Sequence, residues 1–305
     1  MDQRQLRALL AVGEHRSFSA AAKALNTVQS NVSTHVARLE RELGVTLIDR
    51  AVNELTAEGR VVAERARRID HEYEALASDV AAMRDVVTGS VRIGIIGTTA
   101  RWIVPGFLTR LKAHYPEVRV VILDATTSSL VLHLAGGQLD LAIVNTPVED
   151  PELSSEDLFV EQRILVVPLE HPLADRDSVT LAEVAKHEVL ISAVGTSFRS
   201  ELDEAAERVG VRFISKAEID GMRLLASLAF SGYGAAVLPA SAVPGTLDGA
   251  WRRVMISDIS TRSVGLARRR RGLLSPAERA VAEVIREVVA DEVPQQPGLA
   301  LTGTP

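Results

Sequence analysis

The sequence predicts a chain of three parts: an all-α helix-turn-helix head, a long linker helix, and a two-lobed α/β domain. Three observations support this prediction. Two short helices separated by a polar turn occupy the first sixty residues, an apolar seven-residue repeat follows, and strands alternate with helices from residue 90 onward. The 305 residues are enough for two or three units, because domains usually hold about 100–200 residues.

The helical pair of the head lies between Ser17 and Glu40. The small side chains of Ala20 to Ala22 let the two helices pack closely, and Asn26-Thr27 interrupts the pattern, so the Thr27 hydroxyl is the expected N-cap of the second helix. The apolar positions of that helix are spaced by four, three and four residues: Val32, Val36, Leu39 and Leu43. Its other side begins with short polar side chains: Gln29, Ser30, Ser33 and Thr34. A major-groove recognition helix presents such groups to base edges, and a helical hairpin with a solvated polar side is the alternative.

The linker helix is predicted between Thr56 and Val87, where the sequence has no proline and its only glycine is Gly59. Apolar side chains recur at alternating steps of four and three, which is the a/d seam of a coiled coil: Val62, Ala66, Ile69, Tyr73, Leu76, Val80, Met83 and Val87. A helix of roughly 45 Å cannot bury this seam against a sixty-residue head alone. We therefore favour an intermolecular helix pair over a helix packed on its own chain. A dimer of such heads predicts an inverted-repeat DNA site with half-sites about one helical turn, or a multiple of it, apart.

From Thr88-Gly89-Ser90 onward, strands and helices alternate, which predicts parallel sheets with helices on both faces. In the first set the expected strands are 91–97, 118–123 and 140–144, and the expected helices are 102–115 and 128–135. An extended stretch over 158–168 leads to helices 180–186, 198–209 and 221–231 and strands 188–192, 214–219 and 234–238. The chain returns through strands near 251–257 and 261–268 and ends in a helix over 276–290. Two lobes joined by crossing extended segments predict a ligand cleft between them.

Polar residues at the expected strand ends are the candidates for ligand binding. Gly97-Thr98-Thr99 opens a helix of the first lobe and Gly195-Thr196-Ser197 opens a helix of the second, so free N–H groups and hydroxyls meet the positive ends of two helix dipoles. This combination suits a carboxylate or another oxyanion, and the alternative is that both segments are N-caps without a ligand. Further candidates are Thr126, Thr127, Asn145, Thr146, Asp220, Gly221 and Gly234. Arg101 and Arg199 lie one turn into the two helices. Either could pair with an acidic ligand, but a charged residue at such a position is more often solvated.

Composition excludes several functions. The chain has no cysteine, which excludes disulfides, thiolate metal sites and a cysteine nucleophile. The seven histidines are scattered, and no Gly-x-Ser-x-Gly, P-loop or Gly-x-Gly-x-x-Gly motif is present, so we expect no enzyme, no metal site and no cofactor. An enzyme in the cleft and a solute-binding transport component are the less favoured alternatives. The first residues form no apolar signal core and no apolar run reaches the roughly 18 residues of a membrane span, which predicts a cytoplasmic protein without membrane contact.

Charge gives only weak support for DNA binding. The net charge is −6, but residues 1–60 hold eight Lys and Arg against seven Asp and Glu. Because DNA affinity depends largely on phosphate contacts, this small basic excess suggests that a dimer is needed for useful affinity. The run from Arg268 to Arg271 could form a nucleic-acid patch, but its position between a strand and the last helix predicts a solvated turn.

An ordered set of residues extends from Leu6 to Gly59: Leu6, Leu9, Ser17-Phe18-Ser19, Ala21-Ala22, Leu25, Gln29, Ser33, Leu39-Glu40, Leu43-Gly44-Val45, Leu47, Asp49-Arg50, Leu55-Thr56 and Gly59. The segment resembles the winged helix-turn-helix domain of the LysR-type transcriptional regulators, which implies that the linker helix is a dimerisation element. Two features depart from the family pattern. Ile48 stands where the family usually has Phe, and the wing from Ala51 to Glu54 is short and poorly basic, so Arg50 is expected to carry most of the phosphate contact. The residues expected to contact DNA are Ser19, Thr27, Gln29, Ser30, Ser33, Thr34, Arg38 and Arg50.

A second ordered set follows: Val91-Arg92-Ile93-Gly94, Ile103-Val104-Pro105, Phe107, Pro116, the run from Gly136 to Ile143, Pro168, His171-Pro172-Leu173, Gly232-Tyr233-Gly234 and Leu238-Pro239. This region resembles the periplasmic-binding-protein-like effector domain of the same family. The expected parts are a head over 1–60, a linker helix over 57–88, an effector domain over 90–291 and a disordered tail over 292–305. Lobe I is expected at about 90–163 and 264–291, and lobe II at about 164–263.

The expected function is sequence-specific transcriptional regulation, modulated by a small anionic metabolite bound between the lobes. The expected partners are double-stranded promoter DNA, a second copy of the chain, and RNA polymerase. A tetramer built as a dimer of dimers is what the family resemblance implies. Such an effector acts only through unequal affinity for two arrangements of the heads.

Overall fold

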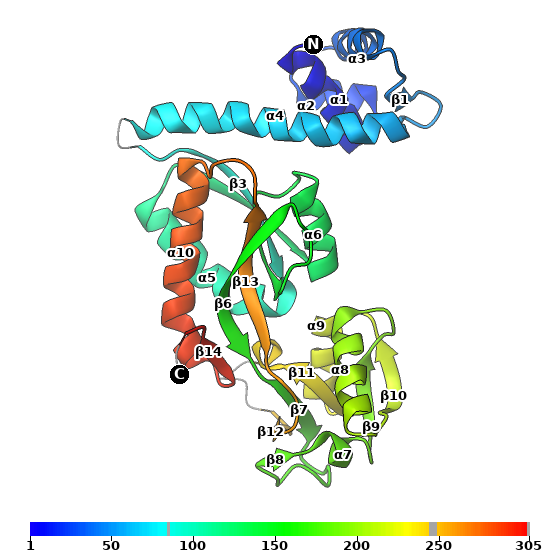
Figure 1. Ribbon diagram of the computed structural model, residues 1–305, viewed down its shortest axis with the longest axis vertical. Coiled ribbons are helices and arrows are strands. Elements are labelled where there is room, and N and C mark those ends of the chain that lie inside the picture. Colours follow the sequence, from blue (N-terminus) through cyan, green and yellow to red (C-terminus); the bar gives the residue numbers. More distant parts are fainter. Residues whose placement is uncertain (84–85, 244–248, 304–305) are drawn as a thin grey trace.

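The computed structural model describes residues 1–83, 86–243 and 249–303. A helical head lies at one end of a long helix, this helix crosses the top of lobe I, and lobe II lies at the far end of the molecule from the head (Figure 1). The predicted linker over 57–88 includes residues 84–85, which lie outside the described residues. Among the described residues, no helix combines the length and the apolar character that a membrane crossing requires.

The head consists of three helices and a two-stranded wing: α1 (Gln3–His15), α2 (Phe18–Ala24), α3 (Gln29–Leu43), β1 (Ile48–Asp49) and β2 (Glu54–Leu55). Its core includes the fully buried side chains of Leu9, Val12, Val32, Val36 and Leu39. Two expectations about α3 were wrong. Its N-cap is Val28 rather than Thr27, and no side chain caps it, because Thr27 Oγ1 accepts a hydrogen bond from Asn31 Nδ2 at 3.0 Å instead. Leu43 lies in the last turn, beyond the reach of the core, and is exposed.

The linker helix α4 (Ala57–Ala82) begins at Thr56, whose hydroxyl accepts from the Gly59 N–H at 2.9 Å. Gly59 allows the start of α4 to lie against the wing, because a Cβ there would meet the Leu47 carbonyl oxygen at 2.0 Å. The first turns of α4 pack on the head through Ala63 and Ala66, which are fully buried. The later turns lie on lobe I (Figure 1), so the helix connects two folded units rather than crossing solvent.

Lobe I is built on a six-stranded sheet in the order β14-β6-β13-β5-β3-β4. Strand β3 pairs in parallel with both β4 and β5, whereas β13 is antiparallel to both β5 and β6. Side chains from α5 and α10 fill its core, including Phe107 and Ile285. The bounds are β3 (Gly89–Ile96), β4 (Val118–Ala125), β5 (Leu141–Thr146), β6 (Leu153–Glu161), β13 (Arg262–Arg269), β14 (Leu299–Leu301), α5 (Gly97–His114), α6 (Thr127–Ala135) and α10 (Pro276–Glu292).

Lobe II contains the second six-stranded sheet, in the order β10-β9-β11-β7-β12-β8. Helix α8 packs Phe198 and Leu202 into one core cluster, and α9 packs Leu225 and Ala229 into another. The chain changes sheets at Gln162, between β6 and β7, and returns between β12 and β13. The bounds are β7 (Arg163–Pro168), β8 (Ser178–Val179), β9 (Glu188–Ser192), β10 (Ile214–Ile219), β11 (Ala235–Pro239), β12 (Trp251–Ile256), α7 (Leu181–Val184), α8 (Ser197–Arg208), α9 (Met222–Phe230) and the 3-10 turn Ala240–Ala242.

The C-terminal tail is ordered, so the prediction of a disordered segment over 292–305 was wrong for its described residues. A 3-10 turn (Val293–Gln295) follows α10, and β14 then adds to the edge of β6 in antiparallel pairing. Leu299 and Leu301 are half-buried against the core of lobe I. The composition is rich in Pro, Gly and Gln, but two leucines at alternate positions of a strand are enough to attach this short segment.

Candidate functional site

The polar side of α3 is exposed, as a DNA-reading surface requires. Gln29, Ser30 and Thr34 are exposed and Ser33 is half-buried. Ser19, on α2, donates from its hydroxyl to Gln29 Oε1 at 2.8 Å, which directs the amide nitrogen of Gln29 away from Ser19. Thr34 Oγ1 donates to the Ser30 carbonyl at 2.8 Å. The structure therefore places these predicted residues on one helix end, with Gln29 held in one orientation.

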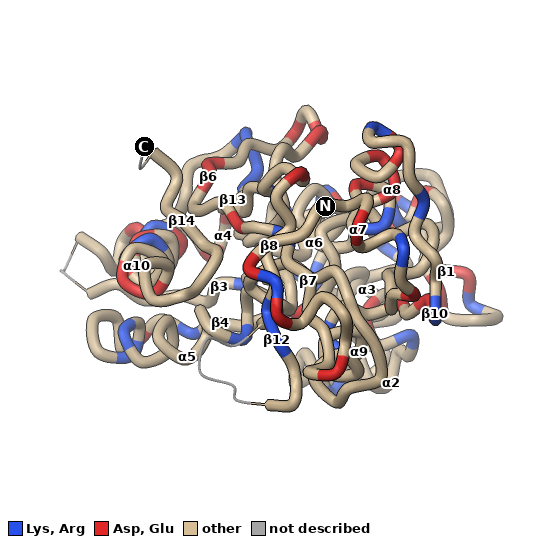
Figure 2. Tube along the Cα trace, turned by 90° about the horizontal axis from the view of Figure 1, so that it is seen from below, with Lys and Arg blue, Asp and Glu red and all other residues tan. Residues whose placement is uncertain are grey.

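Two further DNA-binding candidates lie around this surface. Arg38 is exposed one turn further along α3. Arg50, at the start of the wing, donates to Glu40 Oε2 at 3.2 Å, and its guanidinium carbon lies 5.5 Å from the centre of the Phe18 ring. A phosphate contact from Arg50 therefore competes with Glu40. Charges of both signs are interleaved along the trace of the chain (Figure 2), so the backbone view shows no large region of one sign.

The predicted seam of the linker helix divides into three parts. Val62 and Ala66 pack on the head of the same chain. Val87 lies beyond the end of α4 and packs on lobe I, so it is not part of a helical seam. The other five seam residues are exposed as an apolar stripe, four on α4 and the last at its C-cap: Ile69, Tyr73, Leu76, Val80 and Met83. The prediction of one continuous intermolecular seam was therefore wrong at both ends, because folded units of the same chain cover them.

A cleft of about 510 Å³ separates the two lobes. Nine of the predicted effector-binding residues line it: Gly97, Thr98, Thr126, Thr127, Asn145, Thr196, Ser197, Asp220 and Gly221. Gly195, Thr99, Thr146 and Gly234 do not. Thr99 is fully buried, Thr146 donates to Asp157 Oδ1 at 2.5 Å, and Gly234 packs against Leu190.

Four helices begin at the cleft, and they differ in how their first N–H groups are satisfied. Thr126 caps α6, because its hydroxyl accepts from the Ser129 N–H at 3.4 Å. Thr196 caps α8, because its hydroxyl accepts from the Arg199 N–H at 3.3 Å, so this segment fits the alternative interpretation of a plain N-cap. Helix α5, from lobe I, begins after Ile96, and α9, from lobe II, begins after Gly221, and neither has a side-chain cap. Free N–H groups at a helix start carry partial positive charge. The two lobes therefore present two uncapped helix starts to one cavity.

Four charged residues line the cleft, and sequence reasoning missed three of them. Asp124 Oδ2, at the end of β4, lies 2.8 Å from Arg223 Nη1 of α9, so an ion pair connects lobes I and II. Arg262 pairs with the buried Glu161 at 2.7 Å and lies over the Phe198 ring. Asp124 could have been predicted, because it ends a strand like the other candidates. Arg223 and Arg262 could not have been predicted, because they line the cleft only once the chain has crossed between the two lobes.

Both arginines considered in the sequence make hydrogen bonds within the chain, and Arg101 is exposed, as expected, whereas Arg199 is half-buried. Arg199 donates to Asp203, Glu218 and the Ser192 carbonyl, and Arg101 donates to the Ser241 carbonyl at 3.1 Å. Neither lines the cleft. In contrast, Asn145 Oδ1 is buried and accepts no hydrogen bond from the described residues. Because a buried acceptor without a donor is costly, this oxygen marks a position where a ligand N–H or O–H would fit.

One group of side chains has metal-ligating chemistry: His71 on α4, Asp140 before β5 and Glu278 on α10. Its geometry instead matches an imidazolium bridge, because His71 Nδ1 lies 3.4 Å from Asp140 and Nε2 lies 3.3 Å from Glu278, on opposite sides of the ring. The hydrogen bond to Glu278 raises the pKa of His71, with further help from both carboxylate charges and against the effect of burial. Burial raises the pKa of Asp140, whereas in Glu278 the contacts with His71 and Ser275 outweigh burial and lower the pKa.

Comparisons with known proteins agree with this architecture. Residues 3–60 match the family model of the bacterial regulatory helix-turn-helix proteins, lysR family, and residues 84–290 match the LysR substrate binding domain. A probable hydrogen peroxide-inducible genes activator from Streptomyces viridosporus is 33% identical over 242 residues, which cover 78% of each chain. A protein of the same description from Mycobacterium leprae (strain TN) is 30% identical over 299 residues, or 94% of each chain. A full-length OxyR variant from Pseudomonas aeruginosa has a TM-score of 0.78 at 24% identity, covers 95% of this chain and 94% of its own, and shows a shared fold.

Proposed function

The chain belongs to the LysR family of DNA-binding transcriptional regulators, and from that membership we propose that a small molecule bound between lobes I and II controls its activity. It is a regulator rather than an enzyme. The observation that carries the proposal is the pair of uncapped helix starts, α5 from lobe I and α9 from lobe II, that face one cavity of about 510 Å³. A ligand that contacts both helix starts binds one arrangement of the lobes better than others, and this difference in affinity is what shifts the equilibrium.

The chemistry of the cleft supports a small ligand with an anionic end and a hydrogen-bond donor. The helix starts suit a carboxylate or another oxyanion. The free acceptor Asn145 Oδ1 and the carboxylate of Asp220 suit an N–H or O–H on the same ligand. Asp124 lies beside the start of α5, because its carboxylate is 2.7 Å from where a Gly97 Cβ would lie. A ligand anion and the Asp124 carboxylate therefore compete for the free N–H groups at the start of α5. Asp124 also has an ion-pair partner of its own, Arg223.

Binding is expected to be non-covalent. Relatives of this chain are described as hydrogen peroxide-inducible activators, and reversible peroxide chemistry in proteins commonly proceeds through a cysteine thiolate. The 305 residues contain no cysteine. If this regulator responds to an oxidant, the response has to use another group or a metabolite that the oxidant produces.

The DNA-reading and assembly surfaces are part of the same proposal. The polar start of α3, with Gln29, Ser30, Ser33 and Thr34, reads bases in the major groove, and Ser19, Thr27, Arg38 and Arg50 contact DNA around it. The exposed stripe of α4 pairs with a second copy of the chain and sets the spacing of two heads. A dimer of dimers and contact with RNA polymerase are further expectations for the assembled regulator.

The effector proposal is tested by thermal shift of the full chain against small carboxylates, hydroxy acids, amino acids and inorganic anions. A binding compound raises the melting temperature with its concentration. Thr98→Ala and Asn145→Ala should remove the shift, whereas Thr109→Ala, at the far end of the same helix α5, should keep it. A compound whose shift survives both cleft substitutions binds elsewhere and contradicts the proposal.

The DNA-reading surface is tested with duplexes selected by the protein from a random-sequence pool. Gln29→Ala and Ser33→Ala should weaken discrimination at particular base pairs, by about 1–3 kcal/mol for each lost base contact. Gln138→Ala, exposed on lobe I, is the control. Unchanged base preference in both α3 variants would overturn the assignment of α3 as the reading helix.

A further inference from the structure

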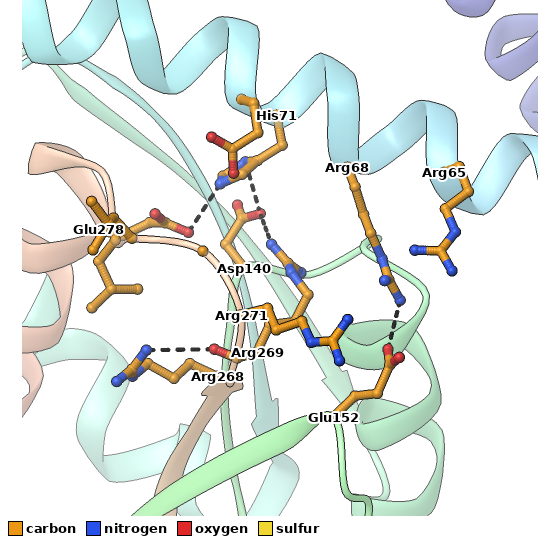
Figure 3. Close-up of a pocket in the computed structure, with 13 residues that line it drawn as sticks. Arg65, Arg68, His71, Asp140, Glu152, Arg268, Arg269, Arg271 and Glu278 are labelled. Carbon is orange, nitrogen blue, oxygen red and sulfur yellow. Dashed lines mark hydrogen bonds and ion pairs between the residues drawn. The ribbon is translucent and has the colours of Figure 1, made fainter.

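A second cavity lies where the linker helix rests on lobe I, apart from the cleft between the lobes. Its volume is about 260 Å³, and it shares no lining residue with the cleft. Arg65 and Arg68 come from α4, whereas Arg268, Arg269 and Arg271 come from the end of β13 and the following loop (Figure 3). The cavity therefore exists only while α4 lies on lobe I.

Arginines dominate the charge of this cavity. Five of them line it, with His71 and four carboxylates. Two of these carboxylates already have strong partners besides His71. Asp140 Oδ2 accepts from the Arg92 N–H at 2.7 Å, and Glu278 Oε2 accepts from the Ser275 N–H at 2.6 Å. Glu152 pairs with Arg68 at 2.8 Å. The lining consequently keeps an excess of positive charge at neutral pH.

Several guanidinium donors of this lining have no protein acceptor. The side chains of Arg65 and Arg271 make no hydrogen bond or ion pair with the residues that the structure describes. Arg65 lies beside Arg68, and Arg271 lies near Glu152, the partner of Arg68 (Figure 3). Arg68 Nε is buried and also has no acceptor in the described part of the chain. A buried charged donor without an acceptor is unfavourable, since its lost hydration is not replaced. Unused donors from α4 and from the β13–α10 loop therefore face one cavity that is partly open to solvent.

We propose that this junction cavity is a second ligand site, which binds a multiply charged oxyanion of the phosphate type between the linker helix and lobe I. Guanidinium groups bind phosphate oxygens through paired N–H donors, and three arginines with free donors from two elements provide this geometry. A metal ion fits the cavity poorly, because the five arginines would repel it. The bound anion contacts Arg65 and Arg68 of α4 and Arg271 of the loop at once, so it fastens α4 to lobe I.

The site is tested by adding inorganic phosphate or pyrophosphate to the full chain without DNA. Sodium chloride at the same ionic strength is the control for general salt effects. Calorimetry should give a dissociation constant for pyrophosphate, and the melting temperature should rise with its concentration. The variant Arg65→Gln/Arg271→Gln should weaken binding by about tenfold or more, since each exposed guanidinium contributes a charged hydrogen bond. Both side chains are exposed, so the variant is expected to fold.

The control is Arg119→Gln/Arg252→Gln, which removes two exposed arginines outside the cavity and keeps the net charge equal to that of the test variant. Equal binding loss in both double variants, or no binding to the parent chain, would overturn the proposal. Loss of pyrophosphate binding in Thr98→Ala but not in Arg65→Gln/Arg271→Gln would place the anion in the interlobe cleft. That result contradicts the junction site and leaves the proposed effector cleft intact.

Discussion

The side chain of His71 connects three elements that are far apart in the sequence. It extends from α4 between Asp140, which precedes β5, and Glu278, in the first turn of α10. Both carboxylates are almost fully buried, and Arg269 Nη2 lies 3.9 Å from Asp140 on the same cluster. When it is protonated, the imidazole of His71 balances, together with Arg269, the two buried carboxylates at the contact between the linker helix and lobe I.

This cluster makes stability depend on pH. The folded state raises the pKa of His71 above its ordinary value of 6.5, mainly through Glu278. The stabilisation from the charged ring is therefore fully present below the unfolded pKa, and it is lost as pH rises through the folded pKa. We expect the melting temperature of the parent chain to exceed that of His71→Gln by more at about pH 6 than at about pH 9. Thermal unfolding of both proteins across this range measures the difference. A gap that is constant with pH would show that the ring acts only through packing.

Some residues of the cleft could be predicted from the sequence, because their positions depend only on which strand they end or follow. Thr126 and Asp220 end or follow strands, and the ends of strands meet at one edge in an α/β lobe. Arg262 was not predictable, since its position depends on the chain recrossing from lobe II to lobe I and on Glu161 being buried at the same crossing. The His71 cluster was missed for the same reason, because its members share no sequence spacing.

At the scale of elements, periodicity predicted most helices and strands but not their partners. Helix α5 begins at Gly97 rather than at Trp102, because Gly97-Thr98-Thr99 forms its first turn directly after β3. The Arg268 to Arg271 run was expected to be a solvated turn, yet Arg269 donates to the Leu134 and Leu139 carbonyls and Arg270 donates to the Leu153 carbonyl. These contacts are long-range, and no local pattern indicates them.

The edge strand β14 should contribute measurably to the stability of lobe I. Its side chains Leu299 and Leu301 are half-buried on the core, and its backbone pairs with β6. We expect Leu299→Ala/Leu301→Ala to lower the free energy of unfolding by about 1–3 kcal/mol, given the apolar area that each leucine loses. Urea denaturation measures this change. Leu273→Ala, at a leucine that is 91% exposed, should alter it by less than about 0.5 kcal/mol. Equal effects of the two variants would mean that the strand is not docked in solution.

At the scale of the whole molecule, the linker helix has three surfaces with different surroundings. Its first turns pack on the head, one side of its later turns packs on lobe I, and the apolar stripe on another side is exposed. An exposed contiguous apolar surface in a soluble protein usually marks an interaction site. Sequence periodicity predicted an intermolecular seam. The structure leaves the central residues of that seam exposed, whereas its ends pack within the chain, because a heptad pattern does not distinguish partners within the chain from partners outside it.

The stripe should hold two chains together. We expect Tyr73→Glu/Leu76→Glu to convert the assembled protein to monomers. The glutamates of the two chains would repel each other, and the apolar side chains that the helix pair buries would be lost. Light scattering coupled to size-exclusion chromatography measures the molar mass. Glu74→Gln, between the two positions, is the control and should leave the mass unchanged. A double variant with the parent mass would show that the chains associate through another surface.

The docking of α4 on lobe I also has a mechanical consequence. The 26 residues of this helix form a stiff rod of about 39 Å. The head packs on one end of the rod, and lobe I contacts its middle. A tilt of about 10° about the middle of the rod, imposed by lobe I, moves its head end by roughly 3 Å, since that end is about 20 Å from the middle. That displacement is close to the rise of about 3.4 Å between neighbouring base pairs. We therefore expect the helix to act as a lever that converts a small rotation beside the sheet into a shift of about one base-pair step at the DNA.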